Sequence, residues 1–112
     1  MGKFVKGDVV VLPFPFSDLR SSKKRPALVV APVEPYDDLI LCMITSKNKR
    51  DVNSVPLTQA DFVTGNLPHD SNVRPNRLFT ADATIILRTA GKLDQRKMGE
   101  VVDEIVQIIR RD

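Results

Sequence analysis

The stretch Ser17-Asp18-Leu19-Arg20-Ser21-Ser22-Lys23-Lys24-Arg25-Pro26-Ala27-Leu28-Val29-Val30 passes from a small polar loop, rich in cations, directly into an apolar run with β-branched residues. Runs of this kind are typical of strands, and proline is accepted at the first residue of a strand. We therefore predict a strand over 26–31, preceded by a loop whose cations suit a phosphate group.

Similar short apolar runs recur along the chain, each ended by proline, glycine or polar residues. Pro13 and Pro15 are expected to end the first strand, because proline cannot sit in a central ladder. Thr58 followed by Asp61 is typical of a capped helical turn, which we expect to end at Gly65. The predicted strands are 8–12, 26–31, 39–45, a weak edge strand at 54–57, 71–74 and 84–90.

The C-terminal segment has the spacing of an amphipathic helix. Asp94 is the expected N-cap, and a helix with such an apolar stripe must pack on the sheet or on a second subunit. Short strands followed by one helix predict a mainly β fold, a small and mostly antiparallel barrel with an appended C-terminal helix. The apolar residues of the helix are Met98, Val101, Val102, Ile105, Ile108 and Ile109.

Composition limits the class of protein. The 112 residues, 42% of them hydrophobic and 28% charged, fit one domain spanning 1–112. No apolar run approaches the roughly 20 residues that cross a membrane, and the N-terminus lacks the apolar core of a signal peptide, so we expect a cytoplasmic protein. Cys42 lies in an apolar strand and is expected to be buried and structural.

Several kinds of site are excluded by the residues present. One histidine and one cysteine make a zinc site improbable, and the scattered carboxylates lack metal-loop spacing. The glycines form neither a phosphate-binding loop nor a dinucleotide fingerprint. His69 cannot alone supply an acid and a base, and we expect it to be exposed without a role. No metal or cofactor is predicted.

Cations gather in three places, at 20–25, at 47–50, and at Arg74 and Arg77, and the net charge is +3. If these edges meet in the fold, they form one basic groove that tracks phosphates. The alternative is three separate solvated loops. Within these clusters, Arg25 offers a planar fork to a phosphate, or else pairs with a carboxylate such as Asp8. Thr45 ends a strand, where its hydroxyl donates to a phosphoryl oxygen or to a loop carbonyl.

Five pieces of the chain occur in the order and spacing of a known family: 7–10, 24–30, 44–47, 70–74 and 91–93. The chain thus resembles the MazF/PemK/Kid-like toxins of type II toxin-antitoxin systems. The resemblance implies an SH3-like barrel of the MazF/PemK/CcdB type that forms a homodimer. It implies a metal-independent endoribonuclease, an mRNA interferase, that cuts single-stranded RNA at short sequences through attack by the 2′-hydroxyl. It also implies silencing by a cognate antitoxin, expected to be small and acidic.

Residue by residue, the resemblance assigns catalytic roles to Arg25 and Thr45, and a role in cleavage or RNA contact to Arg74. The residues expected to bind RNA are Lys23, Lys24, Ser46, Lys47 and Arg77.

The chain departs from the family pattern at Asn76, where some members carry an aspartate proposed as the general base. An amide cannot accept a proton at neutral pH, and an arginine keeps its own. Asp18 and Asp70 are the alternative bases. Two other functions stay open at this point: a non-catalytic relative that binds RNA, and a protein-binding toxin that inhibits gyrase.

Overall fold

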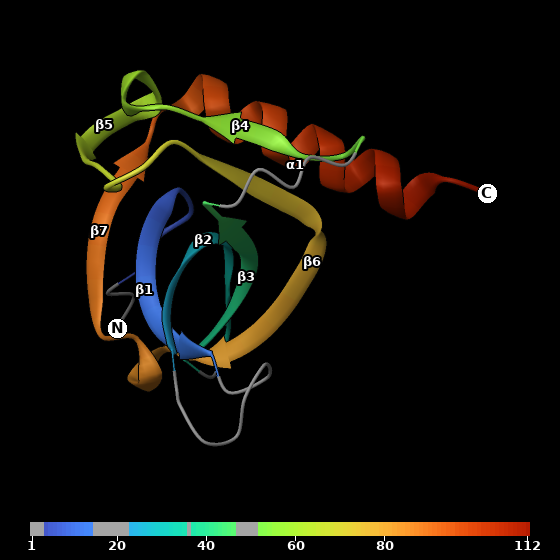
Figure 1. Cartoon of the computed structure of the whole chain (residues 1–112). Coiled ribbons are helices and arrows are strands. Elements are labelled where there is room, and N and C mark those ends of the chain that lie inside the picture. The colour runs from blue at the N-terminus through green and yellow to red at the C-terminus, as the bar shows by residue number, and fades with distance from the viewer. Residues whose placement is uncertain (1–3, 15–22, 36, 47–51) are drawn as a thin grey trace.

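The chain folds into a strongly curved antiparallel sheet with one long helix across one end (Figure 1). The computed structural model describes residues 4–14, 23–35, 37–46 and 52–112. Seven strands within these ranges pair in the order β4-β6-β3-β2-β1-β7-β5. The two ends of this order, β4 and β5, do not pair with each other, so the sheet is a half-barrel. The predicted class, mainly β with a C-terminal helix, is confirmed.

The strands are β1 (Asp8–Phe14), β2 (Lys23–Val33), β3 (Asp38–Thr45), β4 (Val55–Leu57), β5 (Phe62–Gly65), β6 (Ser71–Asp82) and β7 (Arg88–Leu93). Two short 3₁₀ turns, η1 (Gln59–Asp61) and η2 (Ala83–Ile85), and the helix α1 (Gln95–Arg110) complete the described elements.

Both β1 and β2 are longer than the predicted 8–12 and 26–31, and they run through prolines. At Pro13, the ladder between β1 and β7 has already ended, so β1 pairs only with β2. At Pro26, the ladder between β2 and β3 has not yet begun, and at Pro32 the ladder between β2 and β1 has ended. Each of these prolines thus lies where its strand has a neighbour on one side only, which is the kind of position in a sheet that accepts proline.

The predicted turn after Thr58 forms, but it ends at Asp61 and is followed by the unpredicted strand β5. The Asp61 carboxylate accepts a hydrogen bond from the Thr58 N–H at 2.9 Å, which is the expected cap. Gly65 does not end the turn; it ends β5 with φ +66, where a Cβ would collide with the backbone of Ala90 on β7. The close pairing of β5 with β7 therefore requires glycine.

The prediction for 84–90 is wrong in its first half. The Asp82 carboxylate accepts from the Thr84 N–H at 2.9 Å and begins the turn η2, so the apolar residues there are not in a strand. The strand that follows, β7, therefore begins and ends later in the chain than the predicted strand. The strand predicted over 71–74 continues as β6 to Asp82, and the predicted edge strand at 54–57 is confirmed as β4.

The helix α1 begins as predicted, because the Asp94 carboxylate accepts from the Lys97 N–H at 2.8 Å. Met98, Val101 and Ile105 are buried against the sheet. Ile109 was expected on the same face but is 69% exposed, since the last turn of α1 extends beyond the sheet (Figure 1).

The sheet has two faces, each with its own core. The helix-side face carries a cluster that joins the paired residues Val9, Leu28 and Cys42 to α1. The opposite face carries a second cluster that includes Val10 and Ala27. Successive strand residues alternate between these faces, which decides the direction of each candidate side chain.

Candidate functional site

Three predicted site residues lie on the opposite face of three adjacent strands. Met43 of β3 pairs with Ala27 of β2 on one side and with Arg74 of β6 on the other, so these three share a face. Arg25 lies two residues before Ala27, and Thr45 lies two residues after Met43. Because side chains alternate along a strand, Arg25, Thr45 and Arg74 point to the same side of the sheet, near the same end.

A β-bulge follows Arg74. Arg74 pairs with Met43, whereas Leu78 pairs with Cys42, so residues 75–77 have no partner on β3. The bulged proline is buried, and the asparagine and arginine after it are exposed. Bulges of this kind redirect side chains beside functional sites.

Cys42 lies beneath the bulge. Its thiol is fully buried and donates a hydrogen bond to the Arg74 carbonyl at 2.9 Å. Burial raises the pKa of this thiol to about 12. Cys42 therefore stays protonated at neutral pH and is no nucleophile. The prediction that it is buried is confirmed, and its contact supports the backbone that carries Arg74.

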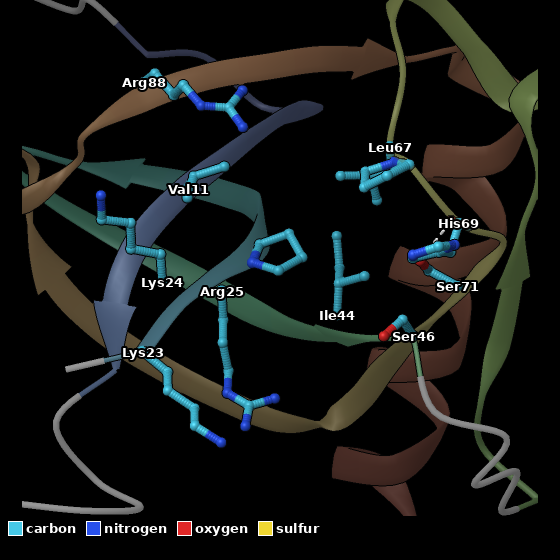
Figure 2. A pocket seen from close by; sticks show the side chains of 12 residues that line it. Val11, Lys23, Lys24, Arg25, Ile44, Ser46, Leu67, His69, Ser71 and Arg88 are labelled. Atoms are coloured by element: carbon cyan, nitrogen blue, oxygen red, sulfur yellow. Dashed lines mark hydrogen bonds between the residues drawn. The ribbon is translucent and has the colours of Figure 1, made fainter. Parts of the chain in front are cut away.

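A pocket of about 360 Å³ opens at this end of the sheet, on the helix-side face (Figure 2). It contains four of the residues predicted for binding or catalysis, Lys23, Lys24, Arg25 and Ser46. Lys24 and Arg25 extend in opposite directions from β2, so Arg25 lines the edge of the pocket and continues toward the opposite face (Figure 2). The remaining lining residues are Val11, Pro26, Ile44, Leu67, Pro68, His69, Ser71 and Arg88.

The other predicted residues are placed elsewhere. Thr45 and Arg74 are half-buried and do not line the pocket, and Arg77 is exposed on the bulge. Lys47 and the candidate base Asp18 lie outside the described residues.

Neither Asp8, the alternative partner predicted for Arg25, nor Asp70, a candidate general base, lines the pocket. The Asp8 carboxylate accepts a hydrogen bond from the Val5 N–H at 3.0 Å. Arg25 pairs with Leu12 near the C-terminal end of β1, whereas Asp8 begins that strand. The register of β1 and β2 therefore does not place Arg25 beside Asp8. Asp70 is exposed and does not line the pocket.

Sequence reasoning assigned no role to three polar residues that line the pocket. His69 was expected to have no role, yet it lines the pocket together with Ser71 and Arg88. The Ser71 hydroxyl donates to the His69 carbonyl at 2.9 Å, which fixes the turn between them. Arg88 arrives from β7, where it pairs with Val11 of β1. Nothing in the local sequence indicates this neighbour, because the register of β1 and β7 is set by the whole sheet.

The pocket is electropositive. Lys23, Lys24, Arg25 and Arg88 line it, and none of the lining residues within 4–14, 23–35, 37–46 and 52–112 is a carboxylate. A concave surface with charges of one sign concentrates ligands of the other sign, so an anion is the expected partner. Of the three cation clusters predicted to form a basic groove, only Lys23, Lys24 and Arg25 line this pocket, together with Arg88. Arg74 and Arg77 do not line it, and residues 20–22 and 47–50 lie outside the described residues.

Within the described ranges, no three His, Cys, Asp or Glu side chains are grouped so as to hold a metal ion. The same ranges contain no helix that is long and apolar enough to span a membrane.

The family sequence profile described as the PemK-like, MazF-like toxin of type II toxin-antitoxin systems matches residues 5–109. The chain belongs to this family. It is therefore a MazF/PemK-like toxin of a toxin-antitoxin system, as the sequence resemblance implied. Among curated proteins, no relative matches the chain.

Solved structures share the fold at low identity. An endoribonuclease from a mycobacterial species, in complex with its cognate antitoxin, superposes with a TM-score of 0.73 at 13% identity, covering 97% of this chain and 95% of that one. The Mycobacterium tuberculosis toxin MazF-mt6 gives 0.72 at 17% identity over 94% and 98%. A MazE-MazF structure from Deinococcus radiodurans gives 0.73 at 18% identity over 97% of both chains. The predicted toxin fold is confirmed.

Proposed function

We propose that this toxin is a metal-independent endoribonuclease that cleaves single-stranded RNA, with Arg25, Thr45 and Arg74 as its catalytic residues. The observation that carries the proposal is their common face on β2, β3 and β6. The electropositive pocket beside Arg25 supports RNA as the substrate. The similar structures described as endoribonucleases support the same class of reaction.

In the proposed reaction, the ribose 2′-oxygen attacks the adjacent phosphorus and loses its proton. The bond to the 5′-oxygen breaks, and that oxygen takes a proton from solvent water and leaves as a hydroxyl. The products carry a 2′,3′-cyclic phosphate and a 5′-hydroxyl. The phosphorane gains negative charge on the way, and fixed donors aimed at that charge lower the barrier.

The three residues divide this work according to their chemistry. Arg25 holds the phosphorane charge with its planar guanidinium. Thr45 donates a hydroxyl hydrogen bond to a phosphoryl oxygen. Arg74, supported from below by the Cys42 thiol, places a second cation near the leaving oxygen. Arginine keeps its proton at neutral pH, so none of the three is the general base.

The general base is expected to be a carboxylate outside these three. Asn76 is exposed on the bulge after Arg74, and its amide accepts no proton. Asp18 and Asp70 are the candidates, and Asp70 directly precedes the pocket residue Ser71 in the chain. Asp70→Asn tests the second of them, because loss of the base slows cleavage without weakening RNA binding.

Lys23, Lys24, Ser46, Lys47 and Arg77 are proposed to bind RNA. We further propose that the toxin acts in the cytoplasm as a homodimer and is silenced by a small acidic antitoxin. Similar structures contain an antitoxin or MazE, and the electropositive pocket would suit an acidic partner.

The test is cleavage of a single-stranded RNA by purified protein in excess chelator. We expect cleavage with 2′,3′-cyclic phosphate ends, identified by mass spectrometry of the fragments. The matched control is the same oligonucleotide with 2′-deoxyribose at the mapped site, which must stay intact because the attacking hydroxyl is absent. Intact RNA under all conditions contradicts the enzymatic proposal.

The amide of Asn76, which cannot act as a general base, favours one second candidate, an RNA-binding relative without cleavage. This alternative predicts that RNA is retained by the protein in a salt-dependent manner and released intact.

A further inference from the structure

We propose that the pocket beside Arg25 receives one unpaired RNA base, held between His69 and Arg88. This inference rests on the proposed function, since it takes RNA as the ligand. It adds a subsite that would contribute to the choice of sequence.

The labelled lining residues stand as two walls with apolar side chains between them (Figure 2). His69, Ser71 and Ser46 lie on one side of the pocket, and Arg88 and Lys24 lie on the other. Ile44, which is 1% exposed, lies between the two sides, and Leu67, which is 6% exposed, lies on the side of His69. A flat ring that carries a phosphate fits this arrangement, because the ring meets the apolar side chains and the phosphate meets the cations.

The two walls have the chemistry that recognises single-stranded RNA. Unpaired bases stack on aromatic rings, histidine included, and on the plane of an arginine guanidinium. His69 supplies the ring and Arg88 the guanidinium, and they come from opposite sides of the pocket.

Hydrogen bonding adds a preference at the edge of the base. The Ser71 hydroxyl already donates its proton to the His69 carbonyl, at 2.9 Å, so its oxygen is left to accept. A base that presents an N–H group toward Ser71 satisfies this acceptor. Ser46, which is exposed, donates or accepts as the base requires.

The size and position of the pocket fit a single nucleotide. Its volume of about 360 Å³ is at the small end of the range for small-molecule sites, roughly 300–1,000 Å³. Lys24 and Arg25 extend to different sides of β2, so a base in the pocket leaves its own phosphate at the edge that Arg25 lines. A paired base cannot enter, which selects single strands.

The test separates base binding from phosphate binding with two probes. One is a single-stranded DNA heptamer of randomised sequence, which lacks the 2′-hydroxyl and cannot be cleaved. The other is a heptamer of the same backbone without any bases. The ratio of their dissociation constants measures how much the protein gains from bases, whichever register the strand adopts.

The variants are His69→Ala, His69→Phe, Arg88→Ala and the matched control Arg111→Ala, which removes the same charge from an exposed position after α1. For the wild type we expect the heptamer with bases to bind about 5- to 150-fold more tightly, the range for stacking one base. His69→Ala lowers this ratio toward one and leaves binding of the base-free heptamer unchanged. His69→Phe keeps the ratio because it keeps a ring, and Arg88→Ala lowers it, whereas Arg111→Ala does not.

A wild-type ratio near one, or a ratio that His69→Ala leaves unchanged, overturns the inference. Failure to bind either heptamer overturns it as well. If RNA is cleaved but the ratio does not depend on His69, the proposed function is supported and the base pocket is contradicted. If the ratio depends on His69 but RNA stays intact, the base pocket is supported and the enzymatic proposal is contradicted.

Discussion

Raising the pH above 9 is predicted to destabilise the native protein through Cys42. Burial raises the pKa of this thiol from its ordinary value of 9.0 to about 12, and the thiol donates to the Arg74 carbonyl. The unfolded thiol therefore ionises near pH 9 while the native thiol stays neutral. The stabilisation is complete below pH 9 and is lost as the pH rises from 9 to 12. Linkage between these two pKa values gives a loss of roughly 1 kcal/mol between pH 8 and pH 10.

The assay is urea unfolding of the wild type and of Cys42→Val at pH 8 and pH 10, at one protein concentration. Valine has no group that titrates, and any packing cost of its extra methyl group is the same at both pH values. The change in the difference between the two proteins therefore isolates the thiol from every other ionising side chain. We expect the wild type to lose roughly 1 kcal/mol more than the variant over this interval. A difference that is the same at both pH values refutes the reasoning. It would mean that the thiol is not shielded beneath the bulge.

Three other perturbations test the fold and the charge of the pocket. Asp61→Asn removes the carboxylate that lies 3.8 Å from the buried Lys97 ammonium and should lower the unfolding free energy by about 2–3 kcal/mol. The control Asp103→Asn, on the exposed side of α1, should change it by no more than about 0.5 kcal/mol. Equal losses in urea unfolding would exclude a special role for the buried pair. Gly65→Ala should destabilise by at least about 1 kcal/mol because its Cβ meets the backbone of β7, whereas Gly99→Ala, whose Cβ meets nothing within 4 Å, should stabilise α1 by about 0.5–1 kcal/mol. Thermal unfolding that ranks these two the other way would contradict the strand pairing. Lys24→Gln should weaken RNA binding and reduce the slope of log affinity against log salt by about 1, measured by titration in rising salt; an unchanged slope would show that Lys24 contacts no phosphate.

The local elements of the fold were largely predictable. The start of α1 at Asp94 depends on one side chain and one backbone N–H, both near in sequence. The β-branched runs of β1, β2 and β3 carry strand propensity within a few residues. Where the local rules failed, the reason was the neighbouring strand: Pro13 ends no strand, because the ladder on one side of β1 has already stopped there.

The candidate site was predictable only in part. Arg25 and Thr45 stand out from their neighbours in the sequence, but their common face with Arg74 depends on the register of three strands. The bulge at 75–77 adds residues that no local pattern indicates. His69 and Arg88 become neighbours of one pocket only through the closure of β7 onto β1, which is a property of the whole sheet.

The most direct test of a catalytic site at Arg25 is the single-turnover rate of RNA cleavage in the presence of a chelator. The rate is measured with one RNA for the wild type, Arg25→Ala and Arg111→Ala. Arg25 is proposed to hold the phosphorane charge, and loss of one such donor typically costs about 10²–10³ in rate. We predict a loss of that size for Arg25→Ala at saturating protein and an unchanged rate for Arg111→Ala. Equal rates for all three proteins would contradict a catalytic site at Arg25.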